Sequence, residues 1–132
     1  MRPNMYRNNA SKYATIHNES VAEEASPHKL IQMLMSGFLM RVNTAKGAIL
    51  RQDYQEKSIQ ISKAAGIVGG LIDGLDLEKG GDIAANLNSL YGYINEKLFQ
   101  ASAENNIEIL DEVSSLVREV QSAWNAIPEM YQ

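Results

Sequence analysis

The stretch 75–93, LDLEKGGDIAANLNSLYGY, decides the fold of this chain, because a Gly-Gly pair is followed there by a long apolar helix. On a helix that turns 100° per residue, the apolar residues of this segment fall within roughly 120° of one another. They are Ile83, Ala84, Leu87, Leu90, Tyr91, Ile94, Leu98 and Ala101. So wide an apolar stripe is typical of a core helix, and other helices must cover it.

The composition excludes several classes of protein. The length of 132 residues fits one domain, and the absence of cysteine excludes disulfides, thiolate nucleophiles and cysteine-based zinc sites. The net charge of -4 and the scattered basic residues argue against a nucleic acid partner. The best apolar run, at 67–72, is far too short to span a membrane, and no secretory signal is recognisable. We therefore expect a cytoplasmic protein that does not insert into membranes.

Capping residues mark the first two helices. Ser26 and Pro27 give an N-cap hydroxyl followed by proline at the first helical position, which predicts a helix over 27–51. Asp53 and Glu56 form a capping-box pattern, which predicts a second helix over 54–75. Their apolar stripes are Ile31, Leu34, Phe38, Val42, Ala45 and Ile49 in the first helix, and Ile61, Ala65, Val68, Ile72 and Leu75 in the second.

Two further helices follow. Asp82 places negative charge in the first turn of a third helix, predicted over 81–103. Asn105 with Glu108 starts the fourth helix, and Pro128 limits its length. Its stripe is Leu110, Val113, Val117, Val120, Trp124 and Ile127. From its place on this line, we expect Trp124 to be a buried anchor of the fourth helix, whose loss would cost roughly 3–5 kcal/mol.

These elements predict an all-α fold, an antiparallel up-down four-helix bundle over residues 26–132. Long helices joined by short connections pack as antiparallel neighbours, and no alternating β pattern occurs in the sequence. Residues 1–25 are rich in Asn, Ser, Ala and Glu and have no sustained period, which predicts a loosely ordered N-terminal arm.

The two histidines raise an alternative function, that of a histidine phosphotransfer bundle. Such a site needs a histidine in the middle of a helix beside a lysine and a glycine. His28 instead stands at the second position of the first helix and His17 lies in the arm, so we expect both to be solvated. The inward-facing Glu-x-x-His motifs of a di-iron bundle are absent from the sequence. We therefore expect no metal, no cofactor and no enzymatic activity.

The second helix carries a row of glycines on its outward side. Gly66, Gly70 and Gly74 recur at every fourth residue, and Ile59 extends the same side. An exposed glycine in a helix costs roughly 1 kcal/mol relative to alanine, which the bundle does not recover. Small residues allow another helix to approach closely. The row is therefore interpreted either as a docking surface for a partner helix or as neutral drift, and a weak homodimer through it is a further alternative.

The first helix carries a second candidate surface. Met33 and Met40 lie beside its core stripe, with Gly37 between them. Methionine adapts to varied apolar partners, which suits a surface that accepts a flexible client, although methionine is more commonly used to fill gaps in cores. In the third helix, Tyr93 and Phe99 fall outside the apolar stripe, as single exposed aromatic residues often do.

The sequence resembles the family of flagellin-specific export chaperones, FliS, over nearly its whole length. The matching segments are Tyr13, ASPHKLIQML at 25–34, Lys63-Ala64, LDLEKGGDIAANLNSLYGYI at 75–94 and Ala123-Trp124. The resemblance implies a cytoplasmic chaperone that binds the C-terminal helices of flagellin, prevents premature polymerisation and supports delivery to the flagellar type III export apparatus. It also implies contacts with the flagellar export gate and with flagellar regulators.

The resemblance further implies a role for the N-terminal arm. In the family, the arm and its tyrosine cover an apolar groove until client displaces them. Here Tyr13 would do so with Ile16, and Ala10 stands where a bulkier apolar residue is expected. The residues expected to bind client are Tyr13, Ile16, Met33, Met40, Ile59, Gly66 and Gly70.

Overall fold

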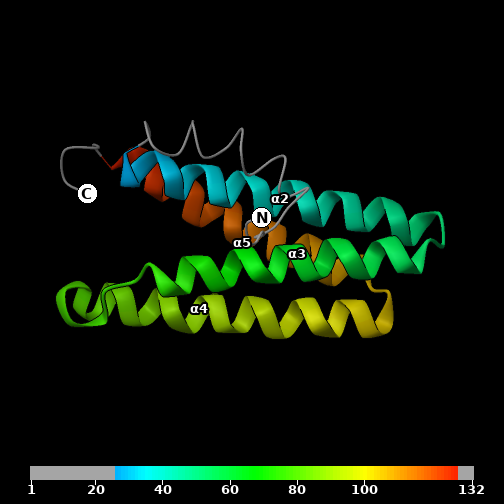
Figure 1. Cartoon of the computed structure of the whole chain (residues 1–132). Coiled ribbons are helices and arrows are strands. Elements are labelled where there is room, and N and C mark those ends of the chain that lie inside the picture. Colours follow the sequence, from blue (N-terminus) through cyan, green and yellow to red (C-terminus); the bar gives the residue numbers. More distant parts are fainter. Residues whose placement is uncertain (1–25, 128–132) are drawn as a thin grey trace, which may run out of the picture. The chain divides into compact units, whose positions relative to one another are not determined.

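The computed structural model describes residues 26–127 and confirms the predicted fold class (Figure 1). The helices are α2 (Pro27–Leu50), α3 (Tyr54–Asp73), α4 (Leu77–Glu104) and α5 (Ile107–Ala126). No strand occurs among these residues. The N-terminal arm predicted over 1–25 lies outside the described residues.

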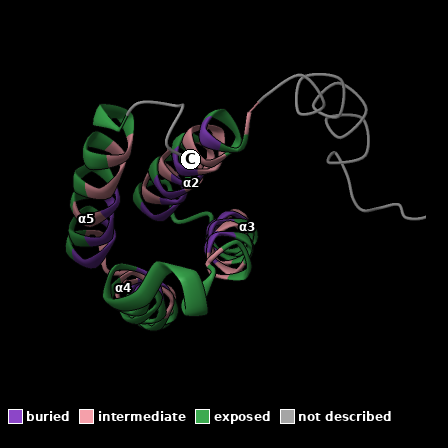
Figure 2. Cartoon of the chain, turned by 90° about the vertical axis from the view of Figure 1, so that its left-hand side faces the viewer, coloured by how far each residue is buried: buried purple, intermediate pink, exposed green. Residues whose placement is uncertain are grey.

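Residues 32–127 form one compact unit, in which each helix runs antiparallel to the next. Residues 26–31, which cap and begin α2, do not belong to this unit. Helix α4 packs closely against both α3 and α5, while side-chain hydrogen bonds join α2 to α3 and to α5. The four helices therefore surround a common core in the order α2, α3, α4, α5 (Figure 2).

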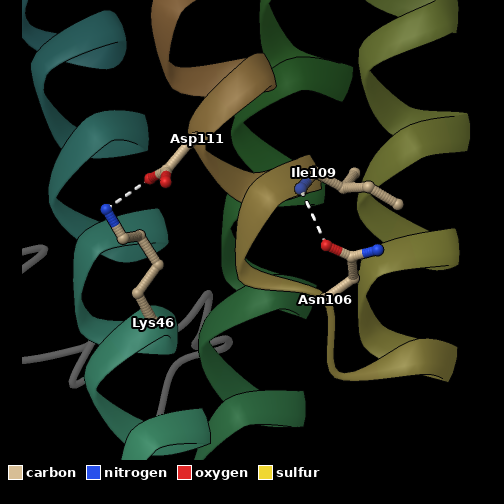
Figure 3. A network of polar contacts seen from close by, with 4 residues as sticks. All are labelled: Lys46, Asn106, Ile109 and Asp111. Atoms are coloured by element: carbon tan, nitrogen blue, oxygen red, sulfur yellow. Dashed lines mark hydrogen bonds and ion pairs between the residues drawn. The ribbon is translucent and has the colours of Figure 1, made fainter.

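A side-chain oxygen caps the start of every helix. The accepting atoms are Ser26 Oγ from Lys29 N (3.1 Å), Asp53 Oδ1 from Glu56 N (3.1 Å), Asp76 Oδ1 from Lys79 N (3.0 Å) and Asn106 Oδ1 from Ile109 N (3.1 Å; Figure 3). The first two caps were predicted. The fourth was predicted one residue too early, because Asn105 ends α4 in the left-handed conformation (φ 53°), which asparagine tolerates well.

Helix α4 begins four residues before the predicted start at residue 81. Asp76 caps a first turn that precedes the glycines, and Gly81 then breaks the helical conformation with φ 55° and ψ −135°. The Gly-Gly pair is thus a break near the beginning of α4. The first turn of α4 precedes this break, and the long regular part of the helix follows it. Ile83 is 73 % exposed, so its predicted place in the core is wrong. The pairing of Lys57 with Ser102 places Ile83 beyond the end of α3 at Asp73, so α3 does not cover it.

The core consists mainly of the predicted stripes. The buried apolar residues within the unit are Met35, Phe38, Val42, Ala45, Ala48, Ile49, Ile61, Ala64, Val68, Leu71, Ala84, Tyr91, Ile94, Leu98, Ala101, Ile109, Leu110, Val113 and Val117. In α3, Ala64 and Leu71 are buried in place of the predicted Ala65 and Ile72, which are only partly buried. Two registers of the same four-three spacing share Ile61 and Val68, so the spacing alone did not choose between them.

The stripe of α5 becomes less buried toward the end of the helix. Val117 is buried, but Trp124 is only partly buried and Ile127 is exposed, so the prediction of a buried Trp124 is wrong. Trp124 lies in the last turn of α5, beside the exposed residues Asn125, Ala126 and Ile127. The periodic stripe continues to the end of the helix, but the burial of its residues does not.

His28 also differs from expectation. It is only 6 % exposed, although it was expected to be solvated, and His17 lies outside the described residues. A position near the start of a helix does not by itself determine how exposed a side chain is. A buried imidazole at the beginning of α2 is poorly placed to accept a phosphoryl group.

Three polar contacts fix the register of α2 against α5. Lys46 forms an ion pair with Asp111 (Figure 3), Gln121 Nε2 donates to Ser36 Oγ at 2.9 Å, and Gln32 Nε2 donates to Asn125 Oδ1 at 2.6 Å. Successive pairs move by equal steps in opposite directions along the two helices, as required for an antiparallel pair. These exposed contacts set the alignment more than they add stability.

A buried lysine of α3 caps the C-terminal end of α4. Lys57 Nζ donates to the carbonyl oxygen of Ser102 at 2.7 Å, and Lys57 also lies 5.6 Å from the ring centroid of Tyr54. Ser102 has one of the last four carbonyls of α4, which lack partners within the helix. A cation near a helix C-terminus also interacts favourably with the helix dipole. Lys57 is therefore a side-chain cap supplied by the neighbouring helix.

Replacing Lys57 by methionine tests this contact. Methionine keeps an apolar stem but leaves the Ser102 carbonyl unpaired, so we expect the free energy of unfolding to fall by about 1–3 kcal/mol. Lys79→Met is the control, because Lys79 is exposed. Urea unfolding of both variants checks the prediction, and equal stabilities would show that the buried contact contributes nothing.

Candidate functional site

Five of the seven predicted client-binding residues lie within the compact unit. Met33 and Met40 are on α2, and Ile59, Gly66 and Gly70 are on α3. Tyr13 and Ile16 lie outside the described residues, so their predicted role stays a prediction.

The outer side of α3 is open, as its sequence suggested. Ile59 is 41 % exposed, and Gly66 and Gly70 are exposed as well. A β-carbon added at Gly66, Gly69 or Gly70 would meet no atom within 4 Å, so no packing requirement within the described structure explains these glycines. The structure confirms their outward position, while their use in docking stays a prediction.

The methionines and the glycine row prove to be neighbours. Arg41 Nη1 donates to Gln60 Oε1 at 3.3 Å, and a β-carbon added at Gly37 would lie 3.5 Å from Ile67 Cδ1. This register brings Met33 level with Gly70 and Met40 level with Lys63 on the outer side of the α2–α3 pair.

We call this surface the α2–α3 face. It comprises Met33, Gly37, Met40, Ile59, Lys63, Gly66, Ile67 and Gly70. Met40 is 58 % exposed, whereas Met33 is only partly exposed. Sequence reasoning treated the two helices separately and therefore missed Ile67 and Lys63. No signal in the sequence marks them, because their place beside the methionines follows only from the alignment of α2 with α3.

The chemistry of the α2–α3 face suits binding rather than catalysis. Its side chains are apolar or absent, apart from the ammonium group of Lys63. Within residues 26–127, no three histidine, aspartate or glutamate side chains gather closely enough to hold a metal ion. A helix that presents apolar side chains could pack over the glycines and contact Ile59 and Met40 at the edges.

The outer side of α4 carries two aromatic residues that differ in their surroundings. Tyr93 Oη donates to Glu112 Oε2 at 2.6 Å, and this hydrogen bond raises the pKa of the Tyr93 hydroxyl because it stabilises the protonated form. Lys97 Nζ lies 5.6 Å from the same ring. Phe99 is exposed, so both residues lie outside the core as predicted. The contacts of Tyr93 tie α4 to α5.

Comparison with known proteins identifies the family. The family model described as flagellar protein FliS matches residues 8–131. This chain belongs to the FliS family. The match to FliS includes Tyr13 and all four helices.

Three bacterial proteins resemble this FliS family member over most of their length. The flagellar secretion chaperone FliSB of Pseudomonas aeruginosa is 46 % identical over 124 residues, which cover 93 % of this chain and 98 % of the relative. The flagellar secretion chaperone FliS of Vibrio cholerae is 37 % identical, with 95 % and 92 % covered. The protein of the same name in Salmonella typhimurium is 40 % identical, with 87 % and 86 % covered. Among the residues described for this FliS family member, no helix is both long and apolar enough to cross a membrane.

Proposed function

We propose that this chain is a cytoplasmic export chaperone for flagellin. It binds the C-terminal helical segment of flagellin, prevents premature polymerisation and supports delivery to the flagellar type III export apparatus. Family membership and relatives named flagellar secretion chaperones support this role. The observation that carries the proposal is the α2–α3 face, an exposed apolar surface with open glycines in a bundle whose core is complete without them.

The mechanism is binding by mass action. A chaperone that binds only the monomeric client lowers the concentration of client free to polymerise. A client segment that folds as it binds must recover its ordering entropy from buried apolar area. The side chains of Ile59, Ile67 and Met40 supply such area, while Gly66 and Gly70 let the backbone of the client helix approach closely.

The N-terminal arm is proposed to compete with the client. An apolar surface left open promotes aggregation, so a segment that covers it until client arrives would be useful. In this proposal residues 1–25 form the arm, with Tyr13 and Ile16 as its apolar contacts, and residues 26–132 form the chaperone domain. The flagellar export gate and flagellar regulators are proposed as further partners.

Substitution of the glycines tests the client surface. In Gly66→Gln/Gly70→Gln, two long side chains prevent close approach, and we expect the Kd for flagellin to rise about tenfold or more. Glutamine has a higher helix propensity than glycine, so the variant should melt at the same temperature as the parent or higher. Binding and stability would then change in opposite directions, which damage to the fold cannot produce.

The matched control is Gly92→Gln on the outer side of α4. A β-carbon at Gly92 also meets nothing within 4 Å, so this substitution brings the same side chain to another open helix. Calorimetric titration with flagellin, and with flagellin that lacks its C-terminal helix, measures each affinity. Unchanged binding by the double variant would remove the α2–α3 face from the proposal, and equal binding of truncated flagellin would contradict the client segment.

A further inference from the structure

Two exposed residues of opposite charge flank the glycine row of α3. On a helix that turns roughly 100° per residue, Lys63 lies roughly 40° from Ile59 toward α2, and Asp73 lies roughly 40° from it toward α4. The side of α3 that faces α2 is identified by Gln60, which accepts a hydrogen bond from Arg41. Ile59, the glycines and the two charges therefore form one outward stripe, and the charges are about 15 Å apart along it.

Neither of these charges has a partner in the part of the chain that the structure describes. Within residues 26–127, Lys63 and Asp73 form no ion pair and no side-chain hydrogen bond. Arg41 of α2 differs, because it donates to Gln60, which donates in turn to Glu56 Oε2 at 2.7 Å. The charge of Arg41 is thus linked to a carboxylate on the neighbouring helix, whereas Lys63 and Asp73 face solvent.

Asp73 stands at a position where an anion is unfavourable for α3 itself. It is the last residue of α3, and the last turn of this helix has no basic residue. A negative charge at a helix C-terminus interacts unfavourably with the helix dipole. Asp73 therefore lowers the stability of α3, as the exposed glycines do, and no contact within residues 26–127 offsets this effect.

We propose that Lys63 and Asp73 set the register of the client helix on α3 by pairing with charges of that helix. This inference rests on the proposed function, in which the C-terminal segment of flagellin docks over Gly66 and Gly70. An acidic side chain of the segment pairs with Lys63, and a basic side chain pairs with Asp73. The two client residues stand roughly ten positions apart, because a helix rises about 1.5 Å per residue.

Apolar contacts alone do not define this register. A client helix with apolar residues at every third and fourth position can slide by one turn over the glycines and bury nearly the same area. A slide of one turn moves both client charges about 5.4 Å along α3, away from Lys63 and Asp73. Ion pairs at the rim of an interface contribute to specificity more than to affinity, so these two residues determine which helix fits and where.

Neutral substitutions separate charge pairing from apolar contact. Lys63→Met removes the charge and keeps an apolar stem, so a Lys63 without a partner in the complex predicts binding as tight as that of the parent or tighter. We expect the Kd for flagellin, measured by calorimetric titration of the full chain, to rise about threefold instead. Asp73→Asn should raise the Kd by a similar factor, while its melting temperature equals or exceeds that of the parent because the unfavourable charge is gone.

Charge reversal in both proteins identifies the client residues. Lys63→Glu should raise the Kd for flagellin about tenfold, because repulsion replaces attraction. Acidic residues in the C-terminal segment of flagellin are then changed to lysine one at a time, and one of these variants should restore the affinity of Lys63→Glu. Asp73→Lys is combined in the same way with basic residues of the segment changed to glutamate. The two rescuing positions should be roughly ten residues apart.

The control variants are Arg118→Glu and Glu119→Lys on α5. They make the same changes in net charge at exposed positions away from α3, and they should bind flagellin as the parent does. Circular dichroism shows that all variants are folded.

The inference and the proposed function fail separately. Binding by Lys63→Met as tight as that of the parent, or the absence of any rescuing flagellin variant, overturns the charge pairing. Loss of binding in Gly66→Gln/Gly70→Gln together with either of these results leaves the client surface standing. A folded parent that binds no flagellin overturns both proposals.

Discussion

Replacement of Phe38 by alanine is expected to lower the free energy of unfolding by about 3–5 kcal/mol, the range for removing a buried aromatic side chain. Phe38 lies on α2 and is 0 % exposed. Its removal costs transfer free energy and leaves a cavity that the close-packed core fills only in part. The sequence predicted a loss of this size for Trp124, but Trp124 is only partly buried. We therefore expect Phe38→Ala to lower the free energy of unfolding more than Trp124→Ala does.

Phe99 provides the matched control, because the chain has just two phenylalanines and the other is 59 % exposed on α4. Phe99→Ala should change stability by no more than about 0.5 kcal/mol. Urea unfolding of the two variants under the same conditions gives both values. Equal losses from both variants would show that the core of the bundle is not organised as described.

Alanine at either glycine of the Gly-Gly pair is expected to destabilise the protein by about 1–3 kcal/mol, for a different reason at each position. At Gly81, φ 55° and ψ −135° form a conformation that is almost confined to glycine. At Gly80, an added β-carbon would lie 2.5 Å from the β-carbon of Ala84, and neither methyl group can rotate away. The backbone must shift in both variants, which would disturb the start of α4.

Gly92→Ala is the control for this pair. Gly92 lies in the regular part of α4 with open space around it, so alanine should raise stability by up to about 1 kcal/mol through its higher helix propensity. Thermal unfolding of the three variants checks the signs. If Gly81→Ala were as stable as Gly92→Ala, α4 would have to be continuous through residue 81.

Much of the fold was decided locally and could be predicted. Ser26 and Asp53 cap their helices because a side-chain oxygen three residues before a free backbone N–H needs no distant partner. Apolar spacing predicted helices at 27–51 and 54–75 that differ from the structure by only one or two residues. The resemblance of the 75–94 segment to the FliS family also came from sequence alone, and the family model confirms it.

The register of buried residues could not be predicted from one helix at a time. The spacing in α3 permits either Ala64 or Ala65 in the core, and only packing against α2 and α4 selects Ala64. Ile83 has the helical phase of the buried Ala101 but is exposed, because the pairing of Lys57 with Ser102 places it beyond the end of α3 at Asp73. Trp124 is only partly buried because it lies in the last turn of α5, and the helical period does not show where along a helix the core ends.

The candidate site shows the same division. The sequence by itself determined that α3 has an outward row of glycines and that α2 has two methionines beside its core stripe, because both follow from the helical period. Only the tertiary structure decided that these features lie on one face. The position of Ile67 beside Gly37 shows how the two antiparallel helices are aligned along each other. Periodicity fixes directions within a helix, whereas the position of one helix along another depends on how their side chains interlock.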